Sequence, residues 1–272
     1  MTWTLGSFSG EMGAMRGLIE RIERGSGVPD LVGFLSERIA PSELTSLLLE
    51  VAARQRARTT PGRVLQPLGA CSAVATVSQN KIVSTMRSTE MLSDATNVLA
   101  LECAKRRKKD RKTPVLLAAS QRVVRAQALP GPNFSAHFRL FSMVAAGRDE
   151  GSFRFEARQL VTQLGYYLAL FTKLGLTKPR VAITPLAGRA FEEAIIAPLA
   201  ERFPEARIHL DLDRSGGRGY YEEICFKLFA TNKNGEEMEV GDGGSVPWTR
   251  KLLSDEKERL IISGLGVERL LT

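Results

Sequence analysis

The chain has 272 residues, of which 43% are hydrophobic and 25% are charged, so its composition is that of a globular protein with an apolar core. This composition excludes disordered, collagen-like and disulfide-scaffold chains. Its 38 lysines and arginines against 30 aspartates and glutamates give a net charge of +8. That excess favours an anionic partner such as a nucleotide, RNA or a phosphorylated substrate.

The three cysteines, Cys71, Cys103 and Cys225, form no CxxC pair and have no histidine beside them. Their number and spacing argue against a disulfide framework and against a zinc site. The N-terminus lacks the apolar core of a signal peptide, and no apolar run approaches the roughly 20 residues that a membrane span needs. We therefore expect a cytoplasmic protein with no metal site and no membrane contact.

The first 40 residues are spotted with glycine and are expected to form an arm ahead of one domain at residues 41–272. A helix is predicted at residues 44–58, and Pro61-Gly62 ends it. Strands are predicted at residues 64–65 and 81–86, followed by a helix at residues 97–107. The apolar face of the first helix repeats at helical spacing through Leu44, Leu47, Leu48 and Val51.

Strands at residues 114–119 and 137–144 are predicted to pair antiparallel across a Pro/Gly loop. The next helix carries a regular apolar face and ends at Gly175, a residue type that suits a left-handed C-cap. Strand, helix and strand then follow at residues 180–184, 190–203 and 207–213. The apolar face of the helix that ends at Gly175 is made by Leu160, Leu164, Tyr167, Leu168 and Phe171.

In the last third, Asn234-Gly235 predicts a type I′ hairpin turn between strands at residues 221–231 and 236–242. A final strand at residues 259–264 leads into a helix start at Gly266. The predicted fold class is therefore α+β, with a mostly antiparallel sheet and helices on one side.

The densest charge in the sequence is the turn from Lys105 to Lys112, which could meet RNA phosphates. The simpler interpretation, a solvated helix end and loop, is favoured because no aromatic residue is interleaved for base stacking.

Common catalytic motifs are absent: there is no GxxxxGK[ST], no GxGxxG after a strand, no HExxH and no GxSxG. The two histidines, His137 and His209, do not support a covalent mechanism. Arginines and carboxylates remain at the predicted strand ends, and arginine there suits polyphosphate recognition. These residues are Arg87, Glu90, Arg122, Arg125, Arg218, Glu222, Glu223, Asp242 and Arg269.

At this point five segments resemble parts of the catalytic domain of class II aminoacyl-tRNA synthetases and follow its order along the chain. The resemblance is strongest to the histidyl-tRNA synthetase branch and its paralogue, the ATP phosphoribosyltransferase regulatory subunit. Residues 44–67 are similar to motif 1, which forms the dimer interface of that family. Residues 84–90 resemble the Leu-Arg-Pro-Glu segment, which implies that Glu90 holds the amino group of a substrate.

Residues 122–139 resemble motif 2, which implies that Arg125 grips the α-phosphate of ATP and that Phe138 stacks on adenine. Gln127 and His137 stand where that motif has an acidic residue and an arginine, so the ATP contacts would be altered. Residues 263–270 are similar to motif 3, which implies that Arg269 contacts the ATP phosphates.

Residues 218–226 resemble the Arg-Gly-Leu-Asp-Tyr-Tyr segment of the histidyl branch. The resemblance implies substrate contacts by Arg218, Tyr220 and Tyr221, and by Asp242, Gly243 and Gly244 further on. Residues 246–248 then replace the polar Arg-Tyr-Asp of that branch with Val, Pro and Trp. An apolar pocket floor and no preference for histidine are therefore expected.

The resemblance implies a stand-alone homodimeric ligase that binds ATP and a small amino acid or carboxylate, with Mg²⁺ left open. Arg125, Arg218 and Arg269 would be its catalytic residues, stabilising the phosphates while an acyl-adenylate forms. Two alternatives stand beside it: a catalytically silent, ligand-sensing regulatory subunit with a protein partner, and a nucleic-acid-binding accessory protein. No anticodon-binding domain is expected, which disfavours a standard translational synthetase.

Overall fold

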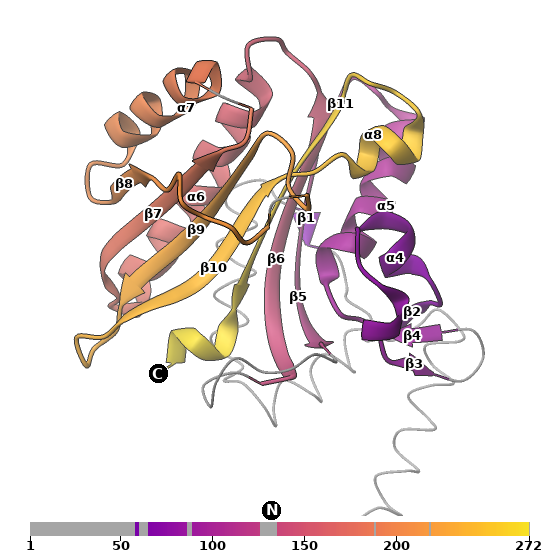
Figure 1. Cartoon of the computed structure of the whole chain (residues 1–272), viewed down its shortest axis with the longest axis horizontal. Helices are drawn as coiled ribbons and strands as arrows, with labels where there is room; N and C mark the ends of the chain where they lie inside the picture. The colour runs from indigo at the N-terminus through magenta and orange to yellow at the C-terminus, as the bar shows by residue number, and fades with distance from the viewer. Residues whose placement is uncertain are drawn as a thin grey trace, which may run out of the picture.

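The computed structural model describes residues 58–59, 65–85, 89–125, 135–187, 189–217 and 219–271 (Figure 1). The predicted arm at residues 1–40 lies outside the described residues. So does the predicted helix at residues 44–58, except for Arg58, which is in a strand.

The centre of the molecule is a twisted sheet of eight described strands. Its edge pairs, β1 with β5 and β7 with β8, are parallel, and the other neighbouring pairs are antiparallel. The predicted antiparallel sheet of an α+β fold is thereby confirmed. The spatial order is β1 (Arg58–Thr59), β5 (Val115–Val124), β6 (His137–Arg148), β11 (Glu258–Gly266), β10 (Glu237–Ser245), β9 (Ile224–Thr231), β7 (Thr177–Pro185) and β8 (Arg207–Leu210).

Helices cover both faces of this sheet, so the expectation of helices on one side is wrong (Figure 1). Successive residues of a strand point to opposite faces of the sheet, and β5 places apolar side chains on both faces. Ala118 packs on the α6 side, whereas Leu117 and Ala119 pack on the α5 side. One face carries α6 (Arg154–Leu174) and α7 (Arg189–Arg202), and the other carries α4 (Ala70–Val74), α5 (Ala95–Lys109) and α8 (Trp248–Leu253).

Two helix ends follow directly from the sequence. α5 begins after Asp94, whose carboxylate accepts a hydrogen bond of 2.9 Å from the backbone N–H of Thr96. α6 ends at Gly175 with φ = 72°, which confirms the predicted left-handed C-cap. The hairpin turn differs from type I′, because Gly235 has a positive φ of 83° and Asn234 does not.

A small second sheet stands beside α4 and the start of α5. It contains β2 (Leu65–Pro67), β4 (Thr89–Met91) and β3 (Ser84–Thr85), and the 3₁₀ helix η2 (Gln79–Lys81) precedes β3. The strand predicted at residues 81–86 is therefore shorter than expected. At the other end of the chain, η3 (Val267–Leu271) follows β11.

A fully buried ion pair ties α5 to the central sheet. Arg107 donates from Nη2 to Glu258 Oε1 at 2.8 Å and from Nε to Oε2 at 3.0 Å, and both side chains are 0% exposed. This bidentate contact fixes α5, and with it the residues at its N-terminal end, against β11.

Candidate functional site

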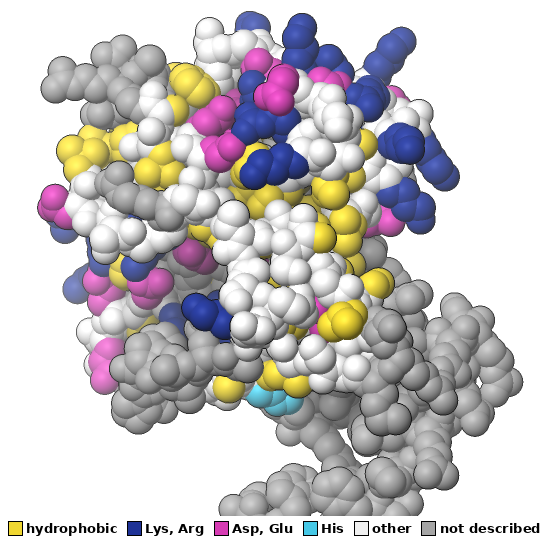
Figure 2. Space-filling view, turned by 45° about the vertical axis from the view of Figure 1, so that its right-hand side comes forward, with side chains coloured by type: hydrophobic (Ala, Val, Ile, Leu, Met, Phe, Trp, Pro, Cys, Tyr) yellow, Lys and Arg dark blue, Asp and Glu magenta, His cyan; other side chains and the backbone are white. Residues whose placement is uncertain are grey.

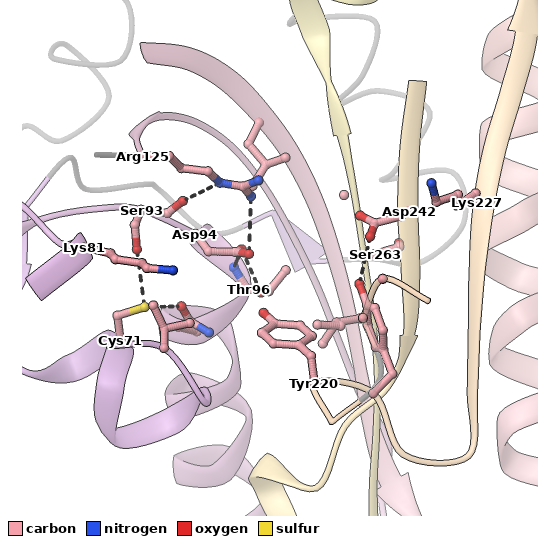
Figure 3. A pocket seen from close by; sticks show the side chains of 18 of the residues that line it. Cys71, Lys81, Ser93, Asp94, Thr96, Arg125, Tyr220, Lys227, Asp242 and Ser263 are labelled. Atoms are coloured by element: carbon pink, nitrogen blue, oxygen red, sulfur yellow. Dashed lines mark hydrogen bonds and ion pairs between the residues drawn. The ribbon is translucent and has the colours of Figure 1, made fainter. Parts of the chain in front are cut away.

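A cavity of about 720 Å³ lies between the α4–α5 side of the molecule and the strands β9, β10 and β11 (Figure 3). Four of the sequence-predicted site residues line it: Arg125, Tyr220, Tyr221 and Asp242. Its other polar lining side chains are Cys71, Lys81, Ser93, Asp94, Thr96, Asn97, Arg214, Lys227, Glu239 and Ser263.

Arg125 directly follows the last residue of β5 and is held from two sides. Its Nε donates to the carbonyl oxygen of Ser93 at 3.2 Å, and the guanidinium lies 5.2 Å from the ring centroid of Phe138. Its Nη2 is 3.6 Å from Asp94 Oδ2. The guanidinium therefore faces the cavity in a fixed position while its acidic neighbour stays beyond hydrogen-bond distance.

Asp94 is the carboxylate that the α5 side presents to the cavity, and the sequence analysis assigned it no role. As the N-cap of α5, its Oδ1 accepts from the backbone N–H and from the hydroxyl of Thr96. Its Oδ2 faces Arg125. The available signal was an aspartate three residues before the helix predicted at residues 97–107.

Glu90, the predicted amino-group ligand, does not line the cavity. It is 0% exposed and accepts four hydrogen bonds, from the side chains of Gln66 and Gln79 and from the backbone N–H groups of Gly69 and Cys71. Burial alone would raise the pKa of this carboxyl, but the four donors outweigh burial and hold the pKa below its usual value. Glu90 thus joins β4 to β2 and α4.

Tyr220, Tyr221 and Asp242 form the wall on the opposite side. Tyr221 donates from its hydroxyl to Asp242 Oδ2 at 3.2 Å, and Arg214 Nη2 is 3.5 Å from the same oxygen. Burial raises the pKa of Asp242, although Arg214 opposes the shift. Burial also raises the pKa values of both phenols well above their usual value, so both stay neutral near pH 7.

Charged and polar side chains also make the floor of the cavity. Lys227 on β9 donates to Glu239 on β10 at 2.8 Å. Ser263 on β11 is positioned by the hydroxyl of Tyr167, with the two oxygens 2.8 Å apart. Alternating positions on these strands point to the same face, which is the sequence signal that could have found them.

The expectation of an apolar floor made by residues 246–248 is wrong. Val246 and Trp248 are each 3% exposed and belong to the core between the sheet and α5. The chain leaves β10 at Ser245 and enters α8 at Trp248, which turns these side chains away from the cavity. Trp248 still supports the site from behind, because its ring meets that of Tyr220 edge-on at 5.5 Å.

The predicted glycines Gly243 and Gly244 lie near the C-terminal end of β10 and do not line the cavity. A Cβ at Gly243 would overlap the carbonyl oxygen of Ile262, and one at Gly244 would overlap that of Ile224. These glycines therefore allow close packing of the central strands.

Arg269 also stands outside the cavity lining, and its Nη1 donates to the backbone carbonyl of Glu239 at 2.7 Å. His137 contacts Arg122, and burial together with that guanidinium lowers the pKa of His137. Glu268 accepts from Arg122 and from the backbone N–H of Arg139. Arg218 and Gln127 lie outside the described residues.

The basic turn from Lys105 to Lys112 spans the C-terminal end of α5 and the loop after it. Its arginines are internally paired: Arg106 with Glu102, Arg107 with Glu258, and Arg111 with Asp255. Figure 2 shows Lys and Arg side chains gathered over this end of the molecule, with Asp and Glu among them. The lysines left exposed there are Lys105, Lys108, Lys109 and Lys112.

The described residues contain no group of three or more His, Cys, Asp or Glu side chains placed to hold a metal ion. The described cysteines are buried and form no disulfide with one another. None of the described helices is long and apolar enough to cross a membrane.

No protein-family model and no curated protein sequence matches the chain. Solved structures do match. Histidyl-tRNA synthetase of S. aureus is 15% identical with a TM-score of 0.63, over 84% of this chain and 63% of that one. A Bacillus halodurans protein described as an ATP phosphoribosyltransferase regulatory subunit/histidyl-tRNA synthetase is 16% identical with a TM-score of 0.63, over 84% and 77%. A histidine–tRNA ligase subunit of Alicyclobacillus acidocaldarius is 11% identical with a TM-score of 0.61, over 84% and 91%.

At these identities the likeness is one of fold. The chain has a class II synthetase-like fold, and its predicted resemblance to the histidyl-tRNA synthetase branch and the related regulatory subunit is confirmed. The chain spans less than two thirds of the length of the S. aureus synthetase.

Proposed function

We propose that this chain binds a small zwitterionic ligand of the amino-acid class in the cavity and acts as a ligand-sensing regulatory subunit. The observation that carries the proposal is the gap of 3.6 Å between Arg125 Nη2 and Asp94 Oδ2. A ligand carboxylate on Arg125 and a ligand ammonium on Asp94 would each gain a charge-assisted hydrogen bond. The neutral phenol of Tyr220 can donate to the one or accept from the other.

A binding role without catalysis is supported by the contacts of two predicted site residues, the catalytic candidate Arg269 and the substrate-binding candidate Glu90. Arg269 donates to a backbone carbonyl and does not line the cavity. The carboxylate of Glu90 accepts hydrogen bonds from four donors within the protein. The B. halodurans neighbour is described as a regulatory subunit. That description supports a protein partner for this chain too, with ligand binding as the signal.

The stacking of Arg125 on Phe138 favours a second candidate function, ATP-dependent activation of the same ligand. Arg125 would then hold the α-phosphate while the ligand carboxylate attacks the α-phosphorus and pyrophosphate leaves as an acyl-adenylate forms. Positioning and charge stabilisation would supply most of the rate enhancement.

Thermal unfolding of the protein with a panel of amino acids, each with and without ATP, tests both candidates. Stabilisation without ATP, together with no amino-acid-dependent pyrophosphate exchange, supports the regulatory function. Amino-acid-dependent pyrophosphate exchange above background supports the ligase function instead. The variant Arg125→Gln should lose the stabilisation, whereas Arg158→Gln, on the exposed face of α6, should keep it. No stabilisation by any amino acid would overturn both candidates.

A further inference from the structure

We infer that the ligand of this cavity carries a second anionic group, so that acidic amino acids or phosphorylated ones bind in preference to neutral isosteres. The inference rests on the proposed function and names the substrate class of the same site. It is carried by the charge of the lining, by the position of Lys81 and by the orphaned amide of Asn97.

The described lining holds more positive than negative charge. A ligand of zero net charge leaves that excess uncompensated in a partly enclosed space, where charge interactions are stronger than in water. A ligand with one net negative charge balances it. The four cations are Lys81, Arg125, Arg214 and Lys227, and the three carboxylates are Asp94, Glu239 and Asp242.

Among the four described cations that line the cavity, Lys81 is the one with no described carboxylate beside it. The other three cations each have a carboxylate oxygen within 4 Å: Arg125 has Asp94 at 3.6 Å, Arg214 has Asp242 at 3.5 Å, and Lys227 has Glu239 at 2.8 Å. No described carboxylate oxygen lies within 4 Å of the Lys81 amine. Figure 3 shows its amine directed from η2 into the cavity, toward the space between Cys71 and Asp94.

Asn97 also lines the cavity and supplies a second, independent observation. It is 0% exposed, and its Oδ1 accepts from Cys71 Sγ at 3.0 Å. Its Nδ2 is buried and has no hydrogen-bond partner among the described residues. A buried donor without an acceptor is destabilising, so oxygen atoms of a ligand at this point would satisfy it. An ammonium and an amide N–H together suit a carboxylate or a phosphate.

Arg125 and Asp94 would thus hold the zwitterionic end of the ligand, and Lys81 with Asn97 would hold its second anionic group. Isothermal titration calorimetry on the full chain with matched pairs tests this: the isosteric pairs glutamate against glutamine and aspartate against asparagine, and the pair O-phosphoserine against serine. The anionic member of at least one pair should bind about tenfold more tightly or better. The pair with the larger ratio distinguishes a carboxylate from a phosphate.

Lys81→Met removes the charge and keeps the length of the side chain, so the ratio within the preferred pair should fall to about one. Lys112→Met, an equal charge change on the exposed basic turn, should leave the ratio unchanged. Equal binding of neutral and anionic members by the parent protein would overturn this inference and leave the proposed function standing. A ratio retained in Lys81→Met would overturn the role of Lys81. Binding of none of the six ligands, nor of any other amino acid, would overturn the proposed function itself.

Discussion

The buried carboxyl of Glu156 should make the protein less stable as the pH rises toward neutrality. Glu156 lies in the first turn of α6 and is 1% exposed. Burial is the main cause that raises its pKa to about 7, and the nearby Glu223 adds to the rise. Arg259 opposes it with Nε 3.2 Å from Oε1, but that guanidinium also pairs with Asp149 at 3.0 Å.

The sign follows from comparing the folded and unfolded states. Below the ordinary pKa of 4.5 both states are protonated, so the group has no effect on stability. Between 4.5 and about 7 the unfolded state releases its proton while the folded state keeps it, and stability falls as pH rises. Above about pH 7 the carboxyl is ionised in both states, and the folded state bears the full free-energy cost of burying the charged carboxylate. The shift corresponds to about 3 kcal/mol of lost stability.

Glu223, which directly precedes β9 and is partly buried, titrates together with Glu156. Burial raises the pKa of Glu223 as well, with Arg259 and Arg250 lowering it and Glu222 raising it. The pH dependence therefore belongs to the pair of carboxyls.

Glu156→Gln replaces the carboxyl by a neutral group of the same shape. Urea unfolding at about pH 4 should give nearly the same free energy for parent and variant, because the parent carboxyl is then largely protonated in both the folded and the unfolded state. At about pH 8 the variant should be more stable by up to about 3 kcal/mol. Glu201→Gln, an exposed carboxyl on α7, should show no such pH-dependent difference. A variant that is equally destabilised at both pH values would refute the reasoning, because the ion pair with Arg259 would then outweigh burial.

Three further predictions concern other parts of the molecule. Arg107→Met leaves the buried charge of Glu258 unpaired and should lower the unfolding free energy by about 3 to 5 kcal/mol in urea, whereas Lys108→Met should change it by less than about 0.5 kcal/mol. Leu68, 49% exposed beside the small sheet, lies next to the expected two-fold interface, so light scattering should show a dimer for the parent and a monomer for Leu68→Glu. Any RNA binding by the basic turn should weaken steeply with salt in a filter-binding assay. The double variant Lys108→Gln/Lys109→Gln should lower the RNA affinity more than an equal charge change on α7 does.

Regular elements were predictable because their patterns are long. The apolar repeat of α6 and its glycine cap appear in the sequence as they do in the structure. The type I′ turn failed because Asn232 organises the hairpin loop: its side-chain oxygen accepts from the backbone N–H groups of Asn234 and Glu236, which leaves only Gly235 with a positive φ. Helices on both faces of the sheet were not expected from the sequence. The signal for them is the run of apolar residues at successive positions of β5, which places apolar side chains on both faces.

The site was predictable where residues lie at the ends of the strands predicted from the sequence, as Arg125 and Asp242 do, although β10 continues past Asp242 to Ser245. Glu90 was predicted as a site residue and Asp94, four residues later, was not, yet Asp94 is the one that lines the cavity. Only the packing of β4 shows which of the two carboxylates faces it. Lys81 and Arg214 lie in short irregular segments with no periodicity, so nothing in the local sequence indicates the direction of their side chains.

A crystal structure of the protein grown with the amino acid that stabilises it most would test the central claim most directly. The account predicts ligand density in the cavity, with its ammonium within about 3 Å of Asp94 Oδ2 and its carboxylate at the Arg125 guanidinium. Density for the ligand at another surface, or a cavity that holds only solvent at saturating ligand, would contradict it.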